Sequence, residues 1–257
     1  MKRRLDSTKY SAGSLTRGLL VLECFSPRRD SFTLADLAKL LDIPKSSLHR
    51  VVKTLSEMNY LRYEEQSKRY YLGMRVLSLG FSVLQSMELR EIARPYLERL
   101  SRECNKTVNL AVFDKDEMVY VERVRVPGIR TYNIGVGNRI PLWTTAVGKA
   151  VLAHLDPEKV RKLFKKVKPP PELSIDEDRF MSILAHVRKD GFAVSNQEHQ
   201  RGILAVAVPV FSSTGVTCAV NLVGEPEDVT MDVLRTEYAP KLMRVGKELS
   251  QALGHRE

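Results

Sequence analysis

Residues 34–73 read LADLAKLLDIPKSSLHRVVKTLSEMNYLRYEEQSKRYYLG, and this stretch decides how the first part of the chain folds. Apolar residues recur at helical spacing over Leu34–Leu41 and again over Lys45–Met58, which predicts two helices. Asp42-Ile43-Pro44 predicts a tight turn between them, because proline disfavours helix in the residue before it and suits the first turn of the next helix. Two helices joined by so short a turn form a helix-turn-helix.

The second half of the same stretch predicts a β-hairpin, or wing. Tyr60–Tyr63 and Arg69–Leu72 read as two strands separated by five polar residues, and Asn59 before them suits a left-handed helix cap. Upstream, apolar spacing predicts another helix over Leu15–Phe25. These elements in this order predict a winged helix-turn-helix domain over residues 14–73.

Most of the net charge lies at this end of the chain. The 257 residues carry 41 Lys+Arg and 31 Asp+Glu, a formal net charge of +10, and residues 1–75 hold 15 basic and 8 acidic side chains, which is +7 of it. Residues 1–13 are polar and basic and are expected to form an arm. A basic module implies a polyanionic partner, either nucleic acid or an anionic membrane surface. Because no basic amphipathic helix of the membrane-surface kind is present, double-stranded DNA is the expected partner and a membrane is not.

The second helix of the predicted helix-turn-helix carries small hydroxyls and cations in its N-terminal half. Such side chains suit a helix that enters the major groove, where the first turns reach phosphates and base edges. A lone helix of this kind is more often just a solvated face, but the surrounding turn and hairpin favour DNA binding. The predicted DNA contacts lie on this helix and on the hairpin: Lys45, Ser46, Ser47, His49, Arg50, Lys53, Lys68 and Arg69.

The remaining sequence predicts a linker helix over residues 74–86 and a second domain over residues 87–257. The apolar face of the linker helix packs either against a partner's copy or on its own domain. Hairpin-linked strands flanked by helices predict an α+β domain around an antiparallel sheet. Helices are expected over Leu89–Cys104, Thr145–His154, Pro157–Lys165, Asp176–Lys189 and Met231–Leu253, and strands over Val108–Phe113, Met118–Val124, Thr131–Ile134, Phe192–Ser195, Leu204–Phe211 and Val216–Val223.

Several classes of protein and of site are not expected. No apolar run approaches the ~20 residues of a membrane span, and the basic N-terminus lacks the apolar stretch of a signal peptide. Cys24, Cys104 and Cys218 are far apart, so neither a disulfide framework nor a zinc site is expected, and a reducing cytoplasm is the expected compartment. The histidines show no metal-ligand spacing and no catalytic motif occurs, so no metal, cofactor or catalysis is expected.

Over nearly its whole length the chain resembles the IclR family of bacterial transcriptional regulators. Beside residues 34–73, two stretches carry the resemblance: RIPLWTTAVGKA at residues 139–150, similar to the family's PLxxTAxGKA segment, and GFAVSNQE at residues 191–198, followed by Ala-Val-Ala at residues 205–207. Ser47 stands where the family usually has threonine, and Asn59 where it has glycine. The resemblance implies a GAF-like second domain that binds a small organic molecule, often a carboxylate.

The resemblance also implies a set of pocket residues in the second domain. Ser195 and Asn221 offer hydrogen bonds, and the helix that starts after Thr144 offers free N–H groups to an anion. Trp143, beside this segment, is more often core than ligand contact, and Glu198 is expected to bond loop amides. The implied effector-binding residues are Ile129, Tyr132, Ala146, Val147, Ser195, Ala205, Asn221 and Val223.

Three functional hypotheses of different classes follow. The preferred one is a one-component, effector-responsive transcriptional regulator, a homodimer or tetramer that represses a catabolic operon and senses a small organic acid. An activator of the same kind is the alternative sign of regulation. The other two hypotheses are an enzyme whose sensor-like domain converts a small acid, and a winged module used only for protein assembly.

Overall fold

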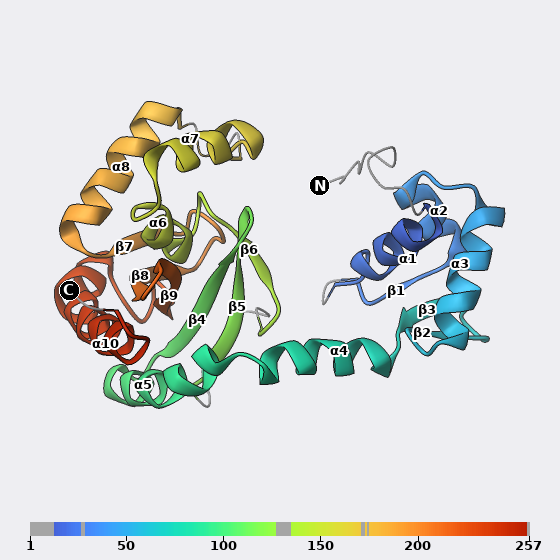
Figure 1. The fold of residues 1–257 in the computed structure, drawn as a ribbon, viewed down its shortest axis with the longest axis horizontal. Helices are drawn as coiled ribbons and strands as arrows, with labels where there is room; N and C mark the ends of the chain where they lie inside the picture. The colour runs from blue at the N-terminus through green and yellow to red at the C-terminus, as the bar shows by residue number, and fades with distance from the viewer. Residues whose placement is uncertain (1–12, 27–28, 127–134, 171–172, 174, 256–257) are drawn as a thin grey trace. The chain divides into compact units, whose positions relative to one another are not determined.

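The computed structural model describes residues 13–26, 29–126, 135–170, 173 and 175–255. The chain divides after Ser86 into two compact units, each with its own secondary structure (Figure 1). The first unit contains helices α1 (Gly13–Glu23), α2 (Leu34–Leu41), α3 (Lys45–Glu57) and α4 (Met74–Gln85), with a small antiparallel sheet in the order β1 (Ser31–Phe32), β3 (Arg69–Leu72), β2 (Leu61–Glu64).

Local signals fix the helix-turn-helix. Thr33 begins α2 with a capping box, in which its hydroxyl accepts the amide N–H of Asp36 and the Asp36 carboxylate accepts the amide N–H of Thr33, both at 3.1 Å. Asp42 then ends α2 in the left-handed conformation, and α3 begins directly after Pro44. The apolar faces of these elements enclose one core, whose buried members are Val21, Phe32, Leu37, Leu48, Val52 and Leu61.

The second unit is built around one antiparallel sheet. Its strand order is β6 (Arg139–Pro141), β5 (Glu117–Val124), β4 (Thr107–Asp114), β9 (Gly215–Gly224), β8 (Leu204–Ser212), β7 (Ala193–Asn196). Helix α6 (Ala146–Leu152) covers one face, and helices α5 (Glu88–Cys104) and α10 (Ala239–Ala252) cover the other. Two consecutive residues of β8 show this, since Ala207 packs in the cluster with α6 whereas Val208 lies against Gly246 of α10.

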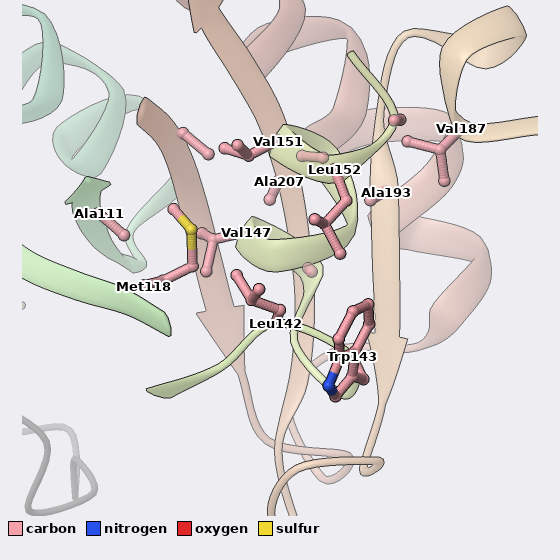
Figure 2. Packing of buried hydrophobic residues seen from close by; sticks show 14 of the residues in the cluster. Ala111, Met118, Leu142, Trp143, Val147, Val151, Leu152, Val187, Ala193 and Ala207 are labelled. Carbon is pink, nitrogen blue, oxygen red and sulfur yellow. The ribbon is translucent and has the colours of Figure 1, made fainter. Parts of the chain in front are cut away.

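One core of this unit lies between the sheet and α6 (Figure 2). Trp143 is 2% exposed, and its ring meets those of Phe164 and Phe180 edge-on at 5.3 and 5.2 Å between centroids. These two rings come from α7 (Pro157–Lys166) and α8 (Glu177–Asp190), which pack beyond α6 (Figure 1). Trp143 is therefore a core residue that anchors the two outer helices.

The C-terminal helix differs from the prediction of one uninterrupted helix over Met231–Leu253. It consists of a short α9 (Met231–Val233), a π-helical segment η3 (Leu234–Tyr238) and α10. Pro240 in the first turn of α10 explains the break, because proline has no N–H and its ring crowds the carbonyl four residues earlier. The chain widens there, and the amide of Ala239 bonds to the carbonyl of Leu234.

Two short strands, β1 and β6, were not predicted. The strand predicted at Thr131–Ile134 lies outside the described residues. The α+β class is confirmed, with winged helix-turn-helix elements at the N-terminal end and an antiparallel sheet in the C-terminal unit.

Candidate functional site

Helix α3 presents most of the predicted DNA contacts on one exposed face. Leu48 and Val52 point into the core, and this turns Lys45, His49 and Arg50 towards solvent. Ser46 and Lys53 are also exposed, and Ser47 is partly so. Lys53 forms a surface ion pair with Glu57 at 3.8 Å, which leaves its charge accessible. Pro44 at the N-cap offers no side chain to cap the helix, so the first-turn amides of α3 are suited to a phosphate.

The two wing residues have different environments. Lys68 is exposed in the hairpin turn, in the left-handed conformation with φ 53°. Arg69 is half-buried, and its Nη1 donates to the carbonyl and the hydroxyl of Ser31 at 3.3 and 3.1 Å. Arg69 thus ties β3 to β1 in this structure, whereas Lys68 is the accessible cation of the wing.

In the second unit, one small cavity brings together five of the implied effector residues. Its volume is about 50 Å³, and it opens between the sheet and the start of α6. The lining residues are Tyr120, Thr145, Ala146, Ser195, His199, Gln200, Ile203, Ala205, Asn221 and Val223. Val147 does not line it, because this side chain is fully buried in the core below α6 (Figure 2). Ile129 and Tyr132 lie outside the described residues.

Buried polar groups form a connected network along one side of the cavity. Asn109 Nδ2 donates to Asn221 Oδ1 at 3.0 Å, and Asn221 Nδ2 donates to the Tyr120 hydroxyl at 3.4 Å. Burial raises the pKa of Tyr120 to about 12, so this phenol is neutral at physiological pH. Ser195 donates to the carbonyl of Thr144 at 2.9 Å, which fixes its hydroxyl. The cavity therefore combines an oriented polar side with apolar walls, as small-molecule sites do.

An ion pair connects α6 to the segment that follows β7. Lys149 of α6 is buried, and its Nζ lies 2.8 and 2.9 Å from the two carboxylate oxygens of Glu198. The amide of Asn196 also donates to Glu198, at 3.4 Å. Glu198 therefore accepts from one backbone amide at the end of β7, where bonds to loop amides were expected, and its principal partner is the ammonium of Lys149. This pair joins the two sequence segments that carry the family resemblance.

Comparison with known proteins gives the family. Two family models match: the IclR helix-turn-helix domain over residues 14–65, and the bacterial transcriptional regulator IclR C-terminal domain over residues 81–251. The chain belongs to the IclR family. It is therefore a transcriptional regulator with a DNA-binding helix-turn-helix, as the sequence predicted.

Relatives within the IclR family include both activators and repressors of transcription. The chain is 31% identical over 249 residues to the p-hydroxybenzoate hydroxylase transcriptional activator of Acinetobacter baylyi, covering 93% of this chain and 91% of that protein. It is 29% identical over 254 residues to the transcriptional repressor IclR of Escherichia coli, covering 94% and 90%. The inducer-binding domain of PobR from Acinetobacter, solved as a double mutant with 3-hydroxybenzoic acid, matches with a TM-score of 0.57 and 30% identity, over 63% of this chain and 97% of that one.

Several residues of this candidate site could not be predicted from the sequence. Tyr120, His199, Gln200 and Ile203 line the cavity, and Lys149 pairs with Glu198. The segment GKA containing Lys149 gave the only sequence signal among them. Within the described ranges, the His, Cys, Asp and Glu side chains form no cluster of three or more suited to a metal ion. None of the described helices has the length and apolarity needed to cross a membrane.

Proposed function

We propose that this IclR-family regulator is a cytoplasmic homodimer, or a pair of such dimers, that represses a catabolic operon until a small carboxylic acid binds. The observation that carries the proposal is the exposed face of α3, where cations and small hydroxyls point away from the core. The chain acts by binding and has no catalytic activity of its own; its curated relatives are regulators. Product formation from a bound acid, seen by mass spectrometry, would refute that last statement.

The side chains on α3 and on the wing are suited to bind double-stranded DNA. Lys45, Arg50, Lys53 and Lys68 reach phosphates, while Ser46 and His49 face the base edges in the major groove. If each of these four cations neutralises one phosphate in each protomer of a dimer, the logarithm of the operator affinity should fall with the logarithm of salt concentration at a slope of about −7, at about −0.9 per phosphate.

Arg50→Ala is expected to weaken operator binding about 10- to 100-fold and to make the salt slope shallower by about 2 per dimer. The guanidinium is exposed on α3 and packs in no core, so folding is unaffected. Fluorescence anisotropy with a duplex operator, at several salt concentrations, measures both quantities. Lys189→Ala, which removes an exposed cation of α8, is the matched control and should leave both unchanged. Equal effects of the two variants would contradict the assignment of α3.

A second copy of the chain is the proposed occupant of the apolar face of α4. Met74, Leu77, Leu79, Phe81 and Val83 are between 51% and 75% exposed on this helix. An exposed apolar surface of this kind marks an interaction site, and two helix-turn-helix modules must pair to read a two-fold operator.

The double substitution Leu77→Asp/Phe81→Asp is therefore expected to break this contact and to weaken association more than about 100-fold, because two carboxylates would be buried without partners. Analytical ultracentrifugation of the full chain reports the change as a fall in mass, from dimer to monomer or from tetramer to dimer. Ser82→Asp adds a charge to the polar side of the same helix at a small, exposed position and serves as the control. A double variant with the wild-type mass would refute α4 as the interface.

The cavity beside Tyr120 and Asn221 is the proposed effector site. The PobR domain of Acinetobacter, solved with 3-hydroxybenzoic acid, supports an organic acid as the class of ligand. A cavity of about 50 Å³ is smaller than the ~150 Å³ that holds a benzene ring, so an aromatic acid must displace its walls. The acid then binds the displaced conformation more tightly than the closed one. If acid binding changes the affinity for DNA by some factor, DNA binding must change the affinity for the acid by the same factor.

A further inference from the structure

Strand β5 contains a bulge beside the cavity. Its residues pair regularly with β4 from Val124↔Val108 to Glu122↔Leu110, and the register then shifts so that Tyr120 lies opposite Ala111. In a regular strand, side chains three positions apart point to opposite faces of the sheet. The extra residue of the bulge removes that alternation, so Tyr120 and Arg123 point to the same face. Bulges of this kind re-aim side chains at functional sites.

That shared face is the one that holds the cavity. Arg123 lies opposite Asn109, and Asn109 lies opposite Asn221, which lines the cavity. Directly opposed residues have Cβ atoms about 5 Å apart, so two such steps, about 10 Å, separate Arg123 from Asn221. Arg123 itself does not line the cavity, but Tyr120 on the same face of β5 does. The charge of Arg123 also acts on the buried phenol of Tyr120, where it opposes the rise of the Tyr120 pKa.

Arg123 has no acidic partner among the residues that the structure describes. Its side chain is half-buried and its Nε is buried without a hydrogen bond. Burial, together with the neighbouring Arg125, lowers the pKa of the guanidinium. By contrast, on the opposite face of β5 the buried Glu122 pairs with Arg90 at 2.8 Å. A guanidinium partly removed from water and beside another cation is unfavourable without an anion.

A second unsatisfied group lies on the same face. Thr107 is 2% exposed, and its hydroxyl has no hydrogen-bond partner within the described part of the chain. Cross-strand pairing places Thr107 in one row with the cavity residues Val223, Ala205 and Ser195, next to the row of Arg123, Asn109 and Asn221. The face thus offers one guanidinium nitrogen and one hydroxyl that have no hydrogen-bond partner in the described part of the chain.

We propose that Arg123, aimed by the β5 bulge, receives the carboxylate of the effector and makes this regulator selective for acids over their neutral amides. The inference rests on the proposed effector site. A planar guanidinium binds a carboxylate through two parallel hydrogen bonds, and in its bond with Asn221 the Tyr120 oxygen accepts, which leaves the phenol hydrogen as a further donor. An amide of the same shape presents one acceptor and no charge.

The first test needs no effector. Thermal unfolding of the ligand-free full chain should show that Arg123→Met melts at or above the wild-type temperature, because it removes an uncompensated cation. Arg90→Met, the matched substitution on the opposite face, should melt lower because it leaves the buried Glu122 unpaired. If Arg123→Met is destabilised as strongly as Arg90→Met, Arg123 is already paired within the fold and the proposal is overturned.

The second test measures selectivity with 3-hydroxybenzoate, benzoate and acetate, each against its amide. At least one acid should stabilise the wild type more than its amide does. Arg123→Met should bind that acid about 10- to 100-fold more weakly, Arg123→Lys should recover part of the loss, and Arg102→Met on exposed α5 surface should behave as wild type. Equal stabilisation by acid and amide, or an unchanged response in Arg123→Met, would overturn the proposal.

DNA binding by the same ligand-free proteins distinguishes a failure of the inference about Arg123 from a failure of the proposed function. If Arg123→Met binds DNA normally and keeps the full acid response, the inference fails and the proposed function stands. If no protein, including wild type, binds duplex DNA, the proposed function fails whatever the acid response.

Discussion

Gly148→Ala is expected to prevent the second unit from folding. Gly148 lies inside α6, and a Cβ built on it would overlap the backbone carbonyl of Leu142. Neither the helix nor Leu142 can move away, because α6 is entirely buried and packs on the inner strands β8 and β9. We expect a loss of more than about 4 kcal/mol in the free energy of unfolding, a large part of the 5–15 kcal/mol typical of a domain.

Thermal unfolding followed by circular dichroism, together with the yield of soluble protein, measures this effect. The matched control is Gly80→Ala in the exposed helix α4, where no atom lies within 4 Å of the new Cβ. That change should be neutral or should stabilise by up to about 1 kcal/mol, because alanine is the better helix former. A Gly148→Ala protein that melts within a few degrees of wild type would show that α6 does not sit so close to Leu142.

Glu198→Gln is expected to cost about 3–5 kcal/mol, because it leaves the ammonium of Lys149 buried and without a counter-charge. The Lys149 side chain is only 7% exposed and that of Glu198 27%, so water reaches the ammonium poorly once the carboxylate is lost. The double substitution Lys149→Met/Glu198→Gln should recover most of that loss, since an apolar chain of similar length then fills the same space.

Chemical denaturation of wild type, the two single variants and the double variant gives the coupling energy of the pair. A purely additive result would mean that Lys149 and Glu198 do not depend on each other. In that case the ion pair would not be what joins the GKA segment to the segment ending in Glu198.

The helices and the hairpin of the first unit could be predicted because their signals are local. Thr33, three residues before Asp36, makes a capping box, and Pro44 marks the start of α3. Strands β1 and β6 were missed because two or three residues carry no periodicity, and only their partner strands define them. The π-helical segment had a local cause in Pro240, but an unbroken apolar pattern outweighed it.

The candidate site was harder to predict, because its geometry depends on pairings between distant segments. Lys149 and Glu198 are 49 positions apart, and nothing near either one indicates the other. Val147 was assigned to the pocket beside Ala146, yet one step along a helix turns it into the core. Arg123 carries no sequence signal, because the bulge that turns it towards the face of the cavity exists only in the register of β5 with β4.

Selection of duplexes from a random DNA library by the full-length protein, at physiological salt, tests the central claim most directly. We expect enrichment of a two-fold symmetric sequence whose half-sites lie about 34–36 Å apart, one helical turn, or a multiple of that distance. Affinity for the selected duplex should fall steeply with salt and should drop in the Arg50→Ala variant. Failure to enrich any duplex over the starting library would contradict the claim that this chain is an operator-binding regulator.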